Sequence, residues 1–434
     1  MTNETQKAPR RYEKMRDSGV EWIGMVPSHW EIVRARAHFR QTNERGNQTP
    51  ILLAASQKFG VCPQDQLEGV VKVSAGTDLQ QFKTVHRNDF IISLRSFQGG
   101  FELSPFEGVC SPAYQVFRAD DAYDVKYLRF LFKDERFIDH INSLTVGIRD
   151  GKNIKYSDFS NSLIILPPLN EQRAIAKSLS QVSAKIDTLI DEVKAGIEEY
   201  TAWKASIIYE AVTKGLDPTA EMKDSGVKWI REMPGHWERT KISNCFTVIG
   251  SGTTPQSSDA AYYGGNISWL QSGDLNGGIV SETAKTLTQA ALNQYSALRI
   301  YKAPYIAIAM YGASIANASI IELDSCTNQA CCVLSTPKKD FDLEYVFYAI
   351  LSAKNELLIS ARGGTQPNIS QDIIKRLLLP IPPLPEQKSI VRKLNQLTRS
   401  IDNLIKEKLY LIGDLESYKK SLIYEVVTGK RRVC

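Results

Sequence analysis

The 434-residue sequence contains no apolar run approaching the roughly 20 residues that a membrane-spanning helix needs. Its first residues, MTNETQKAPRRYEKMRDSG, carry charges but no apolar stretch of the kind found in a secretory signal peptide. We therefore expect a cytoplasmic protein that does not enter a membrane.

Cysteine is sparse and unpaired in its spacing. There are seven cysteines, and no two of them form a C-x-x-C sequence. Disulfide frameworks and zinc ribbons both need paired spacings. We expect reduced thiols that mainly pack in the interior, and no metal site.

The usual signatures of catalysis are also missing. The five histidines are scattered, apart from His29 and His236, which occupy matching Pro-x-His-Trp sequences. No H-E-x-x-H, G-x-S-x-G or Walker A sequence occurs. Gly250-Ser251-Gly252 has only the beginning of a dinucleotide-binding fingerprint. We expect neither catalytic residues nor a bound cofactor in this chain.

A large charge imbalance is absent as well. The sequence has 53 Lys and Arg against 48 Asp and Glu, a net charge of +5, with 43% hydrophobic residues. This composition is typical of a globular protein and excludes a disordered or fibrous one. The length predicts two or three domains.

The sequence does contain an internal repeat. Residues 15–31 match residues 222–238 at an offset of 207, with 11 identities in 17 positions. At an offset of 215, LPPLNEQRAIAKSL from Leu166 matches IPPLPEQKSIVRKL from Ile381, and SIIYEAVTKG matches SLIYEVVTGK. Matching blocks therefore alternate with two segments whose mutual similarity is faint, which is the pattern of a duplicated architecture.

The repeat divides the chain into an N-terminal segment 1–30, a variable domain 31–160, a constant region 161–237, a second variable domain 238–375 and a constant region 376–434. The last block stops where the central block continues into a sequence like the one that opens the chain. The repeat is thus circular. We expect residues 15–30 to pack beside the end of the C-terminal helix, with the chain ends close together.

Each constant region is predicted to contain a long helix. Both follow a Pro-Pro pair, and Asn170 is the expected N-cap of the first. Apolar residues recur at alternating spacings of four and three, interrupted once in each helix, by Gly196 and by Lys408. This pattern predicts an antiparallel two-helix coiled coil about 60 Å long. Two amphipathic helices packed on separate domains are the alternative. The predicted seam contains the following residues: Ile175, Leu179, Val182, Ile186, Leu189, Val193, Tyr200, Trp203 and Ile207 in the first helix, and Ile390, Leu394, Leu397, Ile401, Leu404, Leu411, Leu415, Tyr418 and Leu422 in the second.

The variable domains are predicted to mix strands and helices, with helical spacing at 125–141 and 343–358. Ser111-Pro112-Ala113-Tyr114 resembles the tetrapeptide with which adenine methyltransferases hold their target, but its second proline is missing. The matching stretch of the second domain is Thr327-Asn328-Gln329-Ala330. We interpret this position as a structural turn or a recognition loop.

The blocks D-S-G-V-x-W-I, P-x-H-W-E, P-P-L-x-E-Q and S-x-I-Y-E-x-V-T together resemble the DNA specificity subunit of type I restriction-modification systems. The resemblance covers residues 14–430. In the second variable domain, Gly252-Thr253-Thr254-Pro255 and Met310-Tyr311-Gly312-Ala313 resemble motifs of the family's target recognition domains. The first domain departs from these motifs and resembles a different subtype.

The resemblance implies an α+β fold in which two α/β target recognition domains are joined by the coiled coil, with a pseudo-two-fold repeat. It implies that each domain reads half of a split, asymmetric site in double-stranded DNA, while the helices set the spacer. It also implies partners: two modification subunits, which bind S-adenosylmethionine and methylate adenine, and two restriction subunits, which use ATP and Mg.

Charge sharpens this expectation. Residues 31–160 hold 17 Lys and Arg against 16 Asp and Glu, and residues 238–375 hold 10 against 11. A free-standing DNA-binding protein usually has a clear positive surplus. We expect the positive charge to be concentrated on one face, with partner subunits holding the duplex as well.

Loops rich in glycine and polar residues are the candidates for contacting DNA bases, because Arg and Lys pair with guanine and Asn and Gln pair with adenine. A role in structural turns or solvated loops is the alternative for these residues. The candidates in the first domain are Arg95, Ser96, Gln98, Arg149, Lys152 and Asn153, and those in the second are Thr253, Thr254, Gln256, Gln271, Ser272, Tyr311, Asn328, Gln329, Arg362, Gln366 and Asn368. For Trp22, Trp30, Trp229 and Trp237 we expect core packing instead of base stacking.

Three other functions remain open at this point. A solitary two-headed DNA-binding protein would bind its site without partners, and a self-contained adenine methyltransferase would bind S-adenosylmethionine. A pure scaffold would have the helices but no base recognition.

Overall fold

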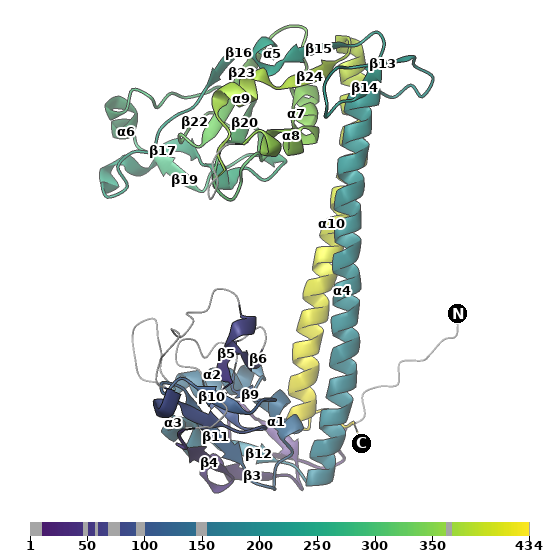
Figure 1. Cartoon of the computed structure of the whole chain (residues 1–434). Helices are drawn as coiled ribbons and strands as arrows, with labels where there is room; N and C mark the ends of the chain where they lie inside the picture. Colours follow the sequence, from purple (N-terminus) through teal and green to yellow (C-terminus); the bar gives the residue numbers. More distant parts are fainter. Residues whose placement is uncertain are drawn as a thin grey trace. The chain divides into compact units, whose positions relative to one another are not determined.

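The computed structural model describes residues 11–46, 51–56, 60–67, 79–92, 100–144, 154–361 and 367–433. The chain forms two compact units (Figure 1). Unit 1 combines Met1–Lys194 with Leu409–Cys434, and unit 2 is Ala195–Lys408.

Unit 1 contains one variable domain together with half of each long helix. Its strands are β1 (Met15–Asp17), β2 (Met25–Pro27), β3 (Glu31–Arg34), β4 (Phe39–Thr42), β5 (Leu52–Ser56), β6 (Gly60–Pro63), β7 (Lys83–Val85), β8 (Phe90–Ile92), β9 (Glu102–Leu103), β10 (Gly108–Cys110), β11 (Gln115–Ala119) and β12 (Leu163–Leu166). Its short helices are α1 (Val125–Leu131), α2 (Glu135–Ser143) and α3 (Tyr156–Asn161).

Unit 2 repeats this plan with longer strands. Its strands are β13 (Met222–Asp224), β14 (Glu232–Pro234), β15 (Glu238–Lys241), β16 (Phe246–Gly250), β17 (Tyr263–Leu270), β18 (Ile279–Val280), β19 (Lys285–Leu287), β20 (Tyr305–Ala309), β21 (Ala318–Ile321), β22 (Ser325–Thr327), β23 (Cys331–Pro337) and β24 (Leu378–Ile381). Its short helices are α5 (Ile242–Cys245), α6 (Gln289–Gln294), α7 (Leu343–Ser352), α8 (Lys354–Ile359) and α9 (Gln371–Arg376).

The two variable domains share their sheet topology although their sequences differ. The first sheet has the order β4-β11-β8-β9 in unit 1 and β16-β23-β20-β21-β18 in unit 2, and the first four strands of each are antiparallel. In the second sheet, β5 runs parallel to β10 and antiparallel to β6, just as β17 runs parallel to β22 and antiparallel to β19. Both domains are thus versions of one mixed α/β fold.

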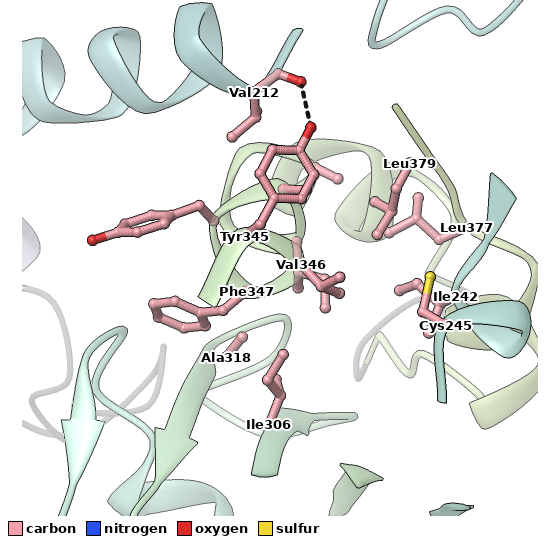
Figure 2. Close-up of a cluster of buried hydrophobic side chains, with 14 of the residues drawn as sticks. Val212, Ile242, Cys245, Ile306, Ala318, Tyr345, Val346, Phe347, Leu377 and Leu379 are labelled. Carbon is pink, nitrogen blue, oxygen red and sulfur yellow. Dashed lines mark hydrogen bonds between the residues drawn. The ribbon is translucent and has the colours of Figure 1, made fainter. Parts of the chain in front are cut away.

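The variable domain of unit 2 is built around an apolar cluster that joins its helices to its first sheet (Figure 2). Tyr345 on α7 is fully buried, and its hydroxyl donates to the carbonyl oxygens of Val212 and Pro380 at 3.2 and 2.8 Å. In unit 1, the Tyr127 hydroxyl donates to the carbonyl of Val427 at 2.9 Å. A buried tyrosine therefore fastens each variable domain to the end of a long helix.

The long helices are α4 (Leu169–Lys214) and α10 (Leu384–Val427). The expected N-cap at Asn170 is wrong, because each helix starts directly after its Pro-Pro pair. The amide of Gln172 already bonds the carbonyl of Pro168, and the amide of Gln387 bonds the carbonyl of Pro383. Proline suits this position because it lacks the amide hydrogen that a first helical turn leaves unsatisfied.

Within each unit, halves of α4 and α10 pack antiparallel, as predicted (Figure 1). In unit 2, Lys204 pairs with Asp402 at 2.6 Å. In unit 1, Lys419 pairs with Asp187 at 2.6 Å, and each of these residues is 215 positions from its counterpart in the other pair. The two ion pairs thus follow the internal repeat.

The two interruptions of the apolar spacing, Gly196 and Lys408, fit against each other. A Cβ atom added to Gly196 would lie 3.1 Å from Nζ of Lys408, and that ammonium group lies 5.5 Å from the centre of the Tyr200 ring. The missing side chain of Gly196 therefore makes room for Lys408.

The seam differs from the prediction at five of its eighteen predicted positions, which are exposed. Leu189 in unit 1 is 47% exposed, whereas the next residue, Ile190, is 6% exposed. The same shift by one residue occurs at Trp203, Leu404, Leu411 and Tyr418, which are all exposed. An apolar stripe wider than a two-residue heptad seam can bury either flank. In this structure the residues that follow the exposed ones, among them Lys204 and Lys419, lie closer to the partner helix, where the two lysines reach Asp402 and Asp187. The five apolar residues on the other side of the stripe stay exposed.

The N-terminal segment closes the circular repeat within unit 1. Trp22, Ile23 and Trp30 are buried in a cluster with Val426 and Val427. Nζ of Lys430 donates to the carbonyl of Ile23 at 2.6 Å, and the guanidinium of Arg432 lies over the ring of Tyr12. In unit 2, the equivalent residues Ile230 and Trp237 are buried against the end of α4. The predicted docking of residues 15–30 is confirmed.

No helix among the described residues is long and apolar enough to cross a membrane. In the same residues, no cluster of three or more His, Cys, Asp and Glu side chains could hold a metal ion.

Candidate nucleic-acid interface

The predicted DNA-contacting residues fall into two groups. Eight of them lie outside the described residues: Arg95, Ser96, Gln98, Arg149, Lys152, Asn153, Arg362 and Gln366. The remaining nine all belong to unit 2 and lie on loops next to its two sheets.

Gly252 allows the loop after β16 to lie directly against the turn between β22 and β23. A Cβ atom added to Gly252 would lie only 1.8 Å from the carbonyl oxygen of Thr327. The amide of Gly252 bonds the carbonyl of Asn328 at 3.4 Å. Only glycine allows this approach between backbones. It brings the GTTP and TNQA motifs, which are 75 residues apart, onto one surface.

Polar side chains from three loops meet on this surface. The Thr254 hydroxyl donates to Oε1 of Gln329 at 2.5 Å. The Gln329 side chain is also hydrogen bonded to the Tyr311 hydroxyl. Tyr311 forms an isolated β-bridge with Asn368, and the amide of Ile369 donates to the carbonyl of Met310 at 2.7 Å. Thr254, Tyr311, Gln329 and Asn368 are therefore brought together, as a shared recognition surface requires.

Asn328 has a different role from its neighbour. It is only 9% exposed, and its Oδ1 accepts from the amide of Ala330 at 3.1 Å. In unit 1, Oγ of Ser111 accepts from the amide of Ala113 in the corresponding turn between β10 and β11. Both side chains close the same kind of turn. This geometry favours the structural interpretation for Asn328 and for the Ser-Pro-Ala-Tyr sequence.

The other candidates lie on neighbouring loops. Gln271 and Ser272 directly follow β17 and are half-buried. The backbone amide of Gln256 donates to the Tyr295 hydroxyl at 3.0 Å, and its side-chain nitrogen donates to the Ser258 hydroxyl. Thr253 is half-buried in the same loop as Gln256. These residues line the loops but are not bonded to Gln329.

One exposed cation beside this surface was not predicted. Nε of Arg299 donates to the Tyr301 hydroxyl at 2.8 Å, and that hydroxyl donates to the carbonyl of Ser251 at 3.1 Å. The Arg299 side chain also lies against Gly250, where a Cβ atom would meet it at 2.1 Å. Nothing in the sequence indicates this contact, because Arg299 is separated from the loop by almost 50 residues and belongs to no motif.

The motifs of the constant regions form hydrogen bonds with one another inside each unit. In unit 1, the Glu171 carboxylate accepts from Nε1 of Trp30 at 3.1 Å and contacts His29 at 2.6 Å. In unit 2, Glu386 does the same with Trp237 at 3.1 Å and with His236 at 2.9 Å. The P-x-H-W and P-P-L-x-E-Q motifs therefore bind each other in both units. Trp30 and Trp237 are core residues, as predicted.

The following glutamine of each P-P-L-x-E-Q motif joins a variable domain to a long helix. The Gln172 side chain accepts from the amide of Asp124 and donates to the carbonyls of Ala122 and Pro167. Asp124 in turn caps α1. Gln387 repeats these bonds in unit 2, where Asp342 caps α7. Both motifs thus fix a variable domain to the start of a long helix.

The comparisons with known proteins match this architecture. The family model described as the type I restriction modification DNA specificity domain matches residues 51–199 and 234–411, which is well over half of the chain. The chain belongs to the family of type I restriction-modification specificity subunits. Members of this family are the non-catalytic DNA-recognition component of such systems.

Two relatives and one solved structure illustrate the similarity of this specificity subunit to others. The MjaVIII specificity subunit of Methanocaldococcus jannaschii is 30% identical over 94% of each chain. The putative MjaX specificity subunit of the same organism is 27% identical over 72% of this chain and 69% of that protein. A solved chain, described with the assembly and conformational transition of a type I system, matches with a TM-score of 0.69 at 16% identity, over 93% of this chain and 98% of its own.

The cysteines of the specificity subunit are packing residues. The six that the structure describes are free and buried. Burial raises the pKa of Cys110, Cys245 and Cys332 to about 12 in each case. A thiol that keeps its proton is a poor nucleophile and a poor metal ligand.

Proposed function

We propose that this specificity subunit reads a split, asymmetric DNA site with one half for each target recognition domain. The observation that supports this most directly is the duplication itself. The same two-sheet fold occurs in both units, and corresponding turns are closed by different residues, such as Ser111 after β10 and Asn328 after β22. Two copies of one scaffold with different loops are suited to reading two different sequences.

The helices set the length of the spacer between the half-sites. Their register is fixed by the two repeat-related ion pairs, Lys204 with Asp402 and Lys419 with Asp187, and by the fit of Lys408 beside Gly196. A register that is fixed at several points leaves little freedom to slide, because any shift would break all of these contacts together.

The helices also dock the methyltransferase subunits. In unit 2, Trp203 and Leu404 are 52% and 39% exposed, and in unit 1, Leu411 and Tyr418 are 45% and 49% exposed. Exposed apolar side chains repeated along a helix indicate a partner surface. Two modification subunits with S-adenosylmethionine would bind here, and two restriction subunits with ATP and Mg would complete the assembly.

Base contacts come from the loops of both domains, and the partners supply much of the electrostatic attraction to phosphate. The near balance of acidic and basic residues in 31–160 and 238–375 supports this division of labour.

The test is to express the chain with its modification subunits and map methylated adenines across the genome. Exchanging residues 32–152 for those of another family member should replace one half-site and leave the other half-site and the spacer unchanged. Deleting one heptad from both helices should alter the spacer and preserve both half-sites. An unchanged methylated sequence after the exchange would reduce the chain to a scaffold. Tight specific binding by the chain alone at physiological salt would favour a solitary binder.

A further inference from the structure

Gln329 is the most completely oriented polar side chain of the recognition surface in unit 2. It is exposed, and it lies in the turn between β22 and β23. Its carboxamide is held by Thr254 from the loop after β16 and by Tyr311 from the loop after β20. The side-chain carboxamides of Asn328 and Gln256, in contrast, are hydrogen bonded within their own loops.

The Thr254 hydroxyl fixes one end of the carboxamide. Oε1 of Gln329 accepts its hydrogen at 2.5 Å. The nitrogen of Gln329 therefore lies at the end of the carboxamide that Thr254 does not hold. Burial raises the pKa of the nearby Tyr311 hydroxyl, and its interaction with Gln329 opposes that rise.

The carboxamide of Gln329 keeps hydrogen-bonding positions for a base. A primary amide has two N–H donors and an oxygen with two lone pairs. Thr254 takes one lone pair, so one lone pair and two donors are left for Tyr311 and for a base. Adenine presents the matching pair in the major groove, its N7 acceptor and its N6 amino donor, whereas guanine presents two acceptors.

We infer that Gln329 reads an adenine in the half-site bound by the second recognition domain, and that Thr254 and Tyr311 are its positioning residues. This inference rests on the proposed function and names one base contact within it. Because Thr254 and Tyr311 already hold the carboxamide, the Gln329 side chain loses little conformational freedom when it binds the base.

Arg299 provides a natural contrast on the same surface. Its guanidinium is exposed, lies 5.1 Å from the centre of the Tyr301 ring and is tied through Tyr301 to Ser251. An arginine beside the recognition loop that is not bonded to Gln329 is suited to a phosphate. Phosphate contacts strengthen binding to all sequences equally.

The experiment measures methylation by the complex of this chain with its modification subunits, on a DNA library in which every base of both half-sites is varied. Gln329→Ala should lower the preference for adenine at one position of one half-site by about 5- to 150-fold, and preferences elsewhere should not change. Thr254→Val and Tyr311→Phe should relax the same position to a smaller extent, and Thr254→Ser, which keeps the hydroxyl, should restore it. Arg299→Ala should reduce methylation of all sequences alike.

Gln289, exposed on α6 and bonded to Asn293, provides the matched control, and Gln289→Ala should change nothing. A uniform loss for Gln329→Ala, a change at a position that is not adenine, or no change at all would each overturn the inference. Exchange of residues 238–375 in the same assay tests the proposed function separately. If that exchange moves no half-site, the proposed function fails; if it moves one and Gln329→Ala does not, only the base contact fails.

Discussion

The recognition domains of unit 1 and unit 2 share the order of most of their strands and have few side chains in common. Where the domains meet the helices, the contacts are repeated almost atom for atom, as with Tyr127 and Tyr345 or Gln172 and Gln387. At the loops, Ser111 and Asn328 close similar turns, but the residues around them differ. The difference teaches that the attachment of a recognition domain needs particular residues, whereas its sheets need only buried apolar strands and its loops remain free to vary.

The largest expected effect comes from breaking the contact between two loops of unit 2. Gly252→Ala would place a methyl group 1.8 Å from the carbonyl oxygen of Thr327, and a backbone atom cannot move aside cheaply. We expect sites with the half-site of the second domain to be methylated about 5- to 150-fold less well, the range that corresponds to roughly 1 to 3 kcal/mol of overpacking. The first half-site should keep its base preferences. Gly273→Ala, with nothing within 4 Å, is the control. Normal half-site discrimination by Gly252→Ala would show that the loops do not need to touch.

A second test compares Glu171 and Glu386, the two glutamates that bind a histidine and a tryptophan of the Pro-x-His-Trp motifs. Glu171 accepts from Tyr12 as well as binding His29 and Trp30, whereas Glu386 binds His236 and Trp237. Replacing either glutamate with alanine leaves a buried indole N–H unpaired, at a cost of roughly 1 to 3 kcal/mol. We expect Glu171→Ala to destabilise unit 1 more than Glu386→Ala destabilises unit 2. Hydrogen exchange of residues 22–30 and 229–237 in the full chain measures both, and equal losses would contradict the comparison.

The smallest expected effect is a dependence on pH in the recognition domain of unit 1 that the recognition domain of unit 2 should not show. Hydrogen bonding to Glu44 raises the pKa of His86, with further help from Asp89 and Glu107. The stabilisation is therefore complete below the ordinary histidine pKa of about 6.5 and is lost as pH rises through the raised value. Residues 238–375 contain no histidine. Hydrogen exchange of residues 79–92 should become faster between pH 6 and 8, beyond its intrinsic increase, and His86→Gln should remove that extra dependence. Because the pair is exposed, the effect will be modest. The same dependence in the variant would exclude His86 as its source.

The sequence predicted the parts of the fold that repeat or alternate regularly. The long helices, their antiparallel pairing within each unit and the docking of residues 15–30 all followed from offsets and spacings. The exposed row of the helices was predicted wrongly, because Leu189 and Ile190 are equally apolar and their neighbours decide which one is buried. The shared topology of the two variable domains could not be predicted, since strand pairing depends on burial patterns that very different residues satisfy.

The candidate site was predicted as a set of loops, but its internal contacts were not. Thr254 and Gln329 are 75 residues apart, and only the fit of Gly252 against Thr327 brings them together. The same limit explains why Asn328 and Gln329 looked equivalent in sequence. One is buried in a turn and the other is exposed, and that distinction depends on backbone direction, which adjacent residues of similar chemistry do not reveal.

The docking of Lys430 on Ile23 also bears on the order in which the chain can fold as the ribosome makes it. Unit 2 is one continuous stretch, Ala195–Lys408, so all of it has been synthesised before the second segment of unit 1 follows. Unit 1 needs segments from both sides of unit 2, because Trp22 and Trp30 are buried against Val426 and Val427. The recognition domain made first is therefore the one completed last, and its unfinished apolar surface stays exposed until Val426 and Val427 leave the ribosome.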